Sequence, residues 1–126
     1  MPKKSCIKTD QAPNPVGAYS QGIIYGDLIF TAQIGLDPKT EKFPGDDIRS
    51  QTQQTLENIS AILAAGGATM GGVLKVTVFL QDLDDFDAMN EVYARFFPGD
   101  PPARATVEAP RLPLGARVEI ECIAGR

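Results

Sequence analysis

The chain has 126 residues, of which 43% are hydrophobic and 22% are charged, and its net charge is −4. This balance is typical of one globular domain, 1–126, and excludes a disordered or fibrous chain, while the acidic charge disfavours nucleic acid as a partner. The chain contains no histidine, which excludes Ser-His-Asp and Cys-His catalysis and removes the commonest metal ligand.

The N-terminal segment, MPKKSCIKTDQAPNPVG, is too polar to be the apolar core of a signal peptide. No run of residues approaches the roughly 18 apolar positions of a membrane-spanning helix. We therefore expect a cytoplasmic protein that does not enter the membrane. In that compartment Cys6 and Cys122, the only two cysteines, are expected to stay reduced.

Residues 19–25 and 28–33 are predicted to form a β-hairpin. Both segments are rich in β-branched and aromatic residues, and Gly26-Asp27 between them suits a tight turn. The next segment, 37–47, is rich in proline, glycine and aspartate and is predicted to be a loop.

A helix is predicted from 46 to 65, because apolar residues recur there mainly at helical spacing. Acidic residues are expected in its first turn and Gly66-Gly67 at its end. Residues 73–80, VLKVTVFL, are too few and too β-branched for a helix. Both faces of this segment carry apolar residues, as in a central strand that is covered on two sides.

A second helix is predicted over 82–97, where apolar side chains form one stripe, and Pro98-Gly99 ends it. We interpret its acidic cluster as favourable first-turn charge and not as a metal site. Strands are predicted at 103–108 and 116–123, the latter with clean alternation of apolar and polar residues. The order β β α β α β β predicts an α+β fold, a mixed β-sheet with two helices on one face.

The opposite face of this sheet has no predicted cover. Two helices can cover only one face of a two-layer domain, whereas segment 73–80 has apolar side chains on both. Because an uncovered apolar sheet face is a site of association, we expect a homo-oligomer.

Several polar side chains are candidates for chemistry, and each has a structural alternative. If the last two strands form a hairpin, Arg104 lies beside Glu119 in a cross-strand salt bridge. Tyr19 also fits a strand edge, Glu119 the polar side of an alternating strand, and Thr106 an ordinary β-former. Asn90 lies on the apolar stripe of a helix, where a buried amide needs hydrogen-bond partners, or else it ties down a loop.

Six segments carry a family likeness: GAYSQGI (17–23), QIGLDPKT (33–40), QTLENISAIL (54–63), LKVTVFLQDLDDFDAMNEVYARFF (74–97), PPARATVEAPRLP (101–113) and RVEIECIA (117–124). Together they resemble the RidA/YjgF family of reactive intermediate deaminases, over nearly the whole chain. The resemblance implies a chorismate-mutase-like fold with ferredoxin-like layers. It also implies a homotrimer with sheets packed inward and active sites between the subunits.

The implied reaction is hydrolysis of reactive 2-imino acids or their enamine tautomers to 2-oxo acids and ammonia. The implied substrates are 2-iminobutanoate and 2-iminopropanoate, the tautomer of 2-aminoacrylate, and no metal or cofactor is implied. The alternative is a small-molecule-binding or regulatory trimer without deaminase activity.

The resemblance also implies roles for individual residues. The arginine of the family's PAR motif, which clamps the substrate carboxylate, falls on Arg104. The tyrosine of G-P-Y-S-Q falls on Tyr19 and the first glutamate of V-E-I-E on Glu119. These two are the implied catalytic residues, with Glu119 orienting or deprotonating the attacking water. The amide of the D-F-x-x-x-N segment falls on Asn90, as a substrate-binding residue.

Three positions depart from the family pattern. Gly17-Ala18 replaces the usual Gly-Pro before the tyrosine, and Thr31-Ala32 stands where a serine and a glycine line the pocket. Thr106 stands where the family often has cysteine. We assign Thr31, Ala32 and Thr106 to substrate binding by position, and we expect no nucleophilic cysteine in the site.

Overall fold

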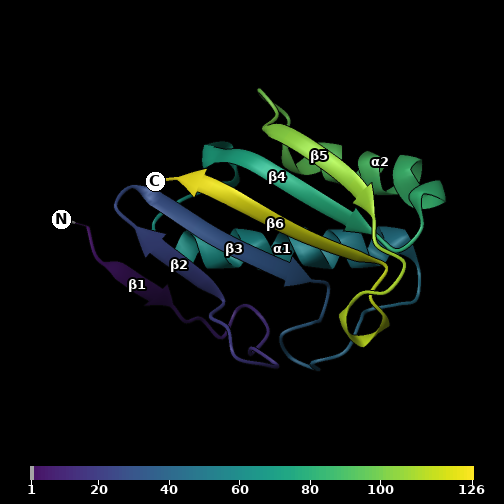
Figure 1. The fold of residues 1–126 in the computed structure, drawn as a ribbon, viewed down its shortest axis with the longest axis horizontal. Helices are drawn as coiled ribbons and strands as arrows, with labels where there is room; N and C mark the ends of the chain where they lie inside the picture. Colours follow the sequence, from purple (N-terminus) through teal and green to yellow (C-terminus); the bar gives the residue numbers. More distant parts are fainter. Residues whose placement is uncertain (1) are drawn as a thin grey trace.

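The computed structural model describes residues 2–126. These residues form a six-stranded sheet with two helices packed behind it, on one face (Figure 1). The strand order is β1-β2-β3-β6-β4-β5. Neighbouring strands are antiparallel except for β4 and β5, which are parallel, so the predicted mixed sheet is confirmed.

The helices and strands are, in chain order, β1 (Lys4–Ile7), β2 (Gly22–Tyr25), β3 (Leu28–Ile34), α1 (Ile48–Ala65), β4 (Val73–Leu80), α2 (Phe86–Phe96), β5 (Ala103–Glu108) and β6 (Val118–Gly125). Short 3-10 turns lie at Met70–Gly72, Leu83–Asp85 and Pro113–Gly115. Strands β4 and β5 have the predicted bounds. β1 is not predicted from the sequence, because only Ile7 of its four residues is buried and no alternation marks the segment.

The predicted hairpin is present as β2 and β3, and Gly26 has the positive φ of 60° that the tight turn requires. β2 begins later than predicted, at Gly22. Tyr19 therefore lies in the loop before the strand instead of within it, and 53% of its surface is exposed. In this loop the direction of the Tyr19 side chain is not set by the alternation of side chains along a strand.

Helix α1 begins at Ile48, two residues later than predicted. Asp47 caps the helix by accepting a hydrogen bond from the Ser50 amide at 2.9 Å, and Asp46 precedes the cap. The prediction of acidic residues in the first turn is therefore wrong. Gly66 and Gly67 end the helix as predicted. No helix in the part of the chain that the structure describes has the length and hydropathy needed to cross a membrane.

The predicted hairpin of the last two strands is wrong. β5 lies at the sheet edge beside β4, whereas β6 lies between β3 and β4. Arg104 is therefore opposite Val76, and Glu119 lies between Ile34 and Phe79. The physical reason is burial. Every second side chain of β6 is buried, beginning with its first residue, and a position between β3 and β4 pairs the strand along both sides.

This register puts Arg104 and Glu119 on opposite faces of the sheet. Arg104 shares a face with buried Val76, and Glu119 shares a face with Phe79, three residues further along β4. Because successive strand residues alternate between faces, Val76 and Phe79 point in opposite directions. The side chain of Arg104 thus lies on the helix side and that of Glu119 on the open side.

The hydrophobic core lies between the sheet and the two helices. Its largest fully buried apolar side chains are Ile29, Leu56, Ile59, Ile62, Leu63, Leu80, Met89, Ile120, Val76, Val78 and Val118. They come from both helices and from the three central strands, β3, β6 and β4. The helices therefore fix the central strands, among them β6, which carries Glu119.

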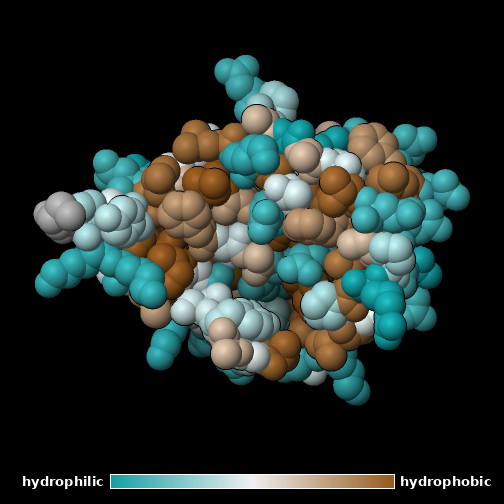
Figure 2. Space-filling view, viewed as in Figure 1, coloured by the Kyte–Doolittle hydropathy of each residue, from teal (hydrophilic) through white to brown (hydrophobic). Residues whose placement is uncertain are grey.

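The other face of the sheet carries exposed apolar side chains, as expected. Leu28 and Phe30 of β3 and Val107 of β5 are each more than a third exposed. Figure 2 shows brown, hydrophobic side chains gathered in several places over this face, with polar ones between them. A face of this kind favours association with another chain.

Gly35, directly after β3, tests how closely the sheet approaches α1. A Cβ atom there would lie 2.5 Å from the backbone oxygen of Gln51 and 2.9 Å from Thr55 Oγ1. Because a helix backbone must move to make room, we expect Gly35→Ala to lower the free energy of unfolding by about 1–3 kcal/mol in urea titrations. Gly99→Ala is the control, since no heavy atom lies within 4 Å of its added methyl. Equal stability of the two variants would contradict this account of the packing.

Candidate active site

The predicted site residues fall into two groups on opposite faces of the sheet. Tyr19, Ala32 and Glu119 line one cavity on the open side. Arg104 and Asn90 meet at the other side, where β5 packs beside α2. The cavity that contains Glu119 does not contain Arg104, and the cavity beside Arg104 does not contain Glu119.

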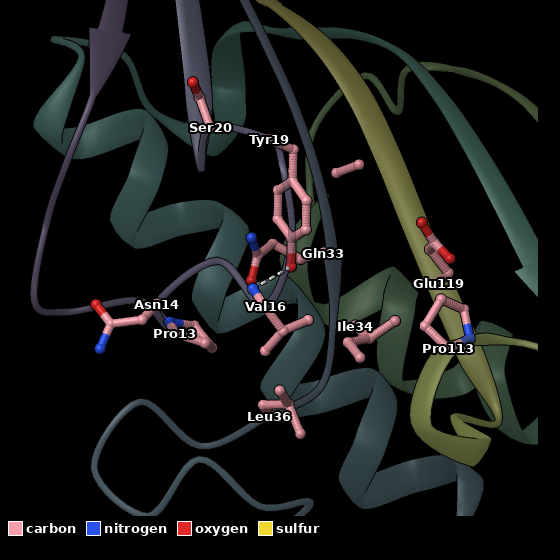
Figure 3. A pocket seen from close by; sticks show the side chains of 11 residues that line it. Pro13, Asn14, Val16, Tyr19, Ser20, Gln33, Ile34, Leu36, Pro113 and Glu119 are labelled. Carbon is pink, nitrogen blue, oxygen red and sulfur yellow. Dashed lines mark hydrogen bonds between the residues drawn. The ribbon is translucent and has the colours of Figure 1, made fainter.

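The first cavity, here called the Tyr19–Glu119 cavity, has a volume of about 250 Å³. It is lined by Pro13, Asn14, Val16, Tyr19, Ser20, Ala32, Gln33, Ile34, Leu36, Pro113 and Glu119. Figure 3 shows Tyr19 and Glu119 on two sides of this space, with Ile34 between them and Leu36 further in. The cavity therefore combines a phenol hydroxyl and a carboxyl with an apolar wall. The sequence pattern did not identify this wall.

The Tyr19 hydroxyl accepts a hydrogen bond from the backbone N–H of Val16 at 3.1 Å (Figure 3). The turn that brings the two together is closed by a second bond, from the Tyr19 amide to the Gly17 carbonyl at 3.0 Å. Because the phenol oxygen is used as an acceptor, its own proton is left free to donate. The loop thus holds the Tyr19 hydroxyl at the cavity with its proton available for donation.

Glu119 is half-buried on β6 and none of the salt bridges in residues 2–126 involves it. Burial raises the pKa of this carboxyl above its ordinary value, and the negative charge of Glu121 adds to the rise. A carboxylate with a raised pKa is a better proton acceptor than an ordinary glutamate. The geometry therefore makes Glu119 the strongest candidate for a general base in the cavity.

The second group centres on Arg104. Its Nη1 donates to Asn90 Oδ1 at 2.8 Å, which answers the question of what Asn90 bonds. The expected salt bridge with Glu119 is absent, because the two side chains lie on opposite faces. A second cavity of about 440 Å³ opens beside this pair, lined by Asn90, Tyr93, Ala94, Phe97, Pro101, Pro102 and Arg104.

The two threonines assigned to substrate binding lie outside the Tyr19–Glu119 cavity. Thr31 is buried and its hydroxyl donates to the Gln21 carbonyl at 2.6 Å, so within one chain that hydroxyl is already bonded. Thr106 is half-buried on β5, two residues from Arg104 and on the same face. The substrate-binding roles of Thr31 and Thr106 stay predictions.

The cysteines are free, as expected from the sequence. Burial raises the pKa of the Cys122 thiol to about 12, with a further contribution from Glu121, so this thiol stays protonated at neutral pH. Within residues 2–126, no three His, Cys, Asp or Glu side chains are grouped so that they could hold a metal ion.

Fold and site together define a small α+β protein with an acid–phenol cavity on an uncovered sheet face and an arginine on the opposite face. The chain belongs to the endoribonuclease L-PSP family, whose model matches residues 9–125.

Its relatives include a RutC family protein of Pyrococcus horikoshii, 52% identical over 96% of this chain and 97% of the relative. The chloroplastic Reactive Intermediate Deaminase A of Arabidopsis thaliana is 46% identical over 97% of this chain and 66% of the plant protein. A crystal structure of Escherichia coli TdcF with bound serine is 41% identical, with a TM-score of 0.93 over 97% of both chains. The resemblance to the RidA/YjgF family and its α+β fold is thereby confirmed.

The pKa of Glu119 gives a direct test of the site's electrostatics. Removing the neighbouring charge with Glu121→Gln is expected to lower the pKa of Glu119, because an ionised carboxylate then meets less repulsion. The measurement is a pH titration of carbon-13-labelled glutamate side chains by NMR. Glu57→Gln, on the exposed side of α1, is the control and leaves that pKa unchanged. An unaltered titration in Glu121→Gln would show that the charge of Glu121 does not reach Glu119.

Proposed function

We propose that this protein hydrolyses short-lived 2-imino acids, such as 2-iminobutanoate and 2-iminopropanoate, to 2-oxo acids and ammonia. The observation that carries the proposal is Glu119, a carboxyl with a raised pKa that shares a cavity with the Tyr19 hydroxyl. The names of the plant and E. coli relatives both contain the words reactive intermediate deaminase, which supports the class of reaction.

The chemistry asks little of the protein, because a protonated C=N carbon is already electrophilic. Glu119 takes a proton from water as the water oxygen bonds to that carbon, which gives a tetrahedral amino alcohol. Glu119 returns that proton to the nitrogen. As the C–N bond breaks, Glu119 takes the hydroxyl proton, the C=O bond forms and ammonia leaves, and the ammonia finally takes up this proton as ammonium. Tyr19 donates a hydrogen bond that orients the water or the departing nitrogen. No histidine is required for any of these steps.

Arg104 is the proposed binding group for the substrate carboxylate. A planar guanidinium holds a carboxylate through two parallel hydrogen bonds, which fix orientation as well as charge. Among the described residues, no carboxylate forms a salt bridge with Arg104. Its remaining donors are therefore free for an acid group from outside the chain.

A complete site then needs two copies of the chain. Within one copy, Glu119 and Arg104 point away from opposite faces of the sheet, so one substrate cannot reach both. The uncovered apolar face offers the means of association. We infer a homotrimer with sheets packed inward, in which Tyr19 and Glu119 of one subunit face Arg104 of the next.

A binding or regulatory role without deamination is the second candidate. The E. coli relative TdcF was crystallised with serine, which shows that a protein of this fold binds a small amino acid. Ammonia release is the discriminating measurement, because a pure binding protein does not accelerate it. The family's name refers to endoribonuclease activity. In this chain the net charge of −4 disfavours an RNA substrate.

Deaminase activity is tested with a threonine dehydratase that generates 2-iminobutanoate in the cuvette. The wild-type protein is expected to accelerate ammonia release. We expect Arg104→Ala to lower kcat/KM by about 10- to 100-fold, the range for a lost hydrogen bond to a charged group. Arg49→Ala is the matched control, because Arg49 pairs with Glu91 on the surface and is expected to leave activity unchanged.

Two outcomes of this assay would count against the proposal. A folded wild-type oligomer that does not accelerate ammonia release would favour the binding role. Full activity in Arg104→Ala would remove Arg104 from the site, whatever the reaction.

The shared site is tested by mixing two impaired variants, Arg104→Ala and Glu119→Gln, and refolding them together, with the activity of each variant alone subtracted. In randomly mixed trimers about a quarter of the subunit contacts join an intact Arg104 to an intact Glu119, so about a quarter of wild-type activity is expected. Native mass spectrometry checks that mixed trimers have formed. Mixed trimers without any recovered activity would place both groups in one subunit's site and overturn the shared arrangement.

A further inference from the structure

Arg104 lies against one face of α2, on which two aromatic rings flank its amide partner. The guanidinium carbon of Arg104 is 4.5 Å from the centre of the Tyr93 ring and 5.5 Å from the centre of the Phe86 ring. Phe86, Asn90 and Tyr93 are spaced i, i+4 and i+7, which places them on successive turns of one helix face. The three side chains together are called the Arg104 cradle.

The cradle stabilises the positive charge of Arg104 although none of its side chains carries a negative charge. Ring faces attract a cation through their quadrupole, and the Asn90 oxygen accepts one N–H of the five that a guanidinium carries. The three salt bridges within residues 2–126 involve Arg49, Arg95 and Arg117, and not Arg104. Arg104 is therefore held in place while its charge is left for an anion.

Tyr93 does not serve as the missing anion. Burial raises the pKa of its phenol, and the nearby cation of Arg104 only opposes that rise, so the ring stays neutral at physiological pH. Its hydroxyl is buried and has no hydrogen-bond partner in the described chain. Arg104 lies over its ring, the same kind of contact that Phe86 makes.

We propose that Phe86 and Tyr93 are positioning residues for substrate binding, because they hold the Arg104 guanidinium in one plane before the substrate carboxylate arrives. A free arginine side chain samples many rotamers, and ordering it on binding lowers affinity. Stacking on fixed rings removes that freedom in advance. This inference rests on the proposed role of Arg104 in binding a carboxylate.

Phe86 is the better residue to test, because it is 36% exposed and contributes less to the core than the buried Tyr93. Phe86→Leu keeps an apolar side chain but removes the ring face, and Phe86→Tyr restores the ring. Phe43→Leu makes the same chemical change in the loop between β3 and α1, outside the cradle. Should Phe86→Leu fail to fold, Phe86→Met replaces it.

The experiment measures the affinity for 2-oxobutanoate by calorimetry, alongside KM and kcat for 2-iminobutanoate. We expect Phe86→Leu to weaken 2-oxobutanoate binding and to raise KM by about 3- to 10-fold, with kcat within about twofold of wild type. The substrate carboxylate carries the same charge before and during the reaction. Weaker binding of that carboxylate by Arg104 therefore raises KM and leaves the rate of the chemical step unchanged. Phe86→Tyr and Phe43→Leu are expected to stay within about twofold of wild type for all three quantities.

Three results would overturn the inference: unchanged 2-oxobutanoate affinity in Phe86→Leu, equal loss in Phe86→Tyr, or no binding of 2-oxobutanoate by the wild type. If Phe43→Leu shows the same rise in KM or the same loss of affinity, the effect of Phe86→Leu reflects a general loss of stability. That result would also count against positioning. Wild-type binding without ammonia release would refute the deaminase proposal alone, since the affinities still decide the role of the cradle.

Discussion

Strand β6 lies in the middle of the sheet, hydrogen bonded to β3 on one side and to β4 on the other. This placement puts alternate residues of β6 into the core and turns Glu119 and Glu121 to the open face. It also separates β6 from β5, so the arginine of β5 cannot pair with the glutamate of β6. The separation of Glu119 from Arg104, on which the proposed two-chain site rests, follows from this one strand position.

The open sheet face links the electrostatics of Glu119 to assembly. Partial burial already raises the pKa of that carboxyl in the single chain, with the charge of Glu121 acting in the same direction. Covering the face with another subunit would remove more water, which raises the pKa of Glu119, whereas the Arg104 cation of the neighbouring subunit in the proposed trimer would lower it. The pKa of Glu119 in the proposed assembly is set by the balance of these two effects.

The site treats its two charged groups in opposite ways. Glu119 is left without a cation, so its proton affinity is high, whereas Arg104 is left without an anion and rests on aromatic rings. An internal ion pair between them would neutralise both groups and leave neither free for a substrate. The fold prevents that pair within one chain by placing the groups on opposite faces, so both groups stay available for the roles proposed for them.

The sequence alone determined the elements that depend on local pattern. The bounds of β4 and β5, the turn at Gly26 and the end of α1 at Gly66 follow from alternation, helical spacing and backbone freedom within short windows. The family motifs located Tyr19, Glu119, Arg104 and Asn90, and the structure grouped them into two clusters.

Only the tertiary structure decided which strands are neighbours. Sequence order favours a hairpin of β5 and β6, yet β6 pairs with β3 and β4, which come much earlier in the chain. The cradle around Arg104 likewise joins β5 to α2, and the short edge strand β1 has no pattern of its own. These features depend on burial of distant segments against one another, a quantity that no short stretch of sequence contains.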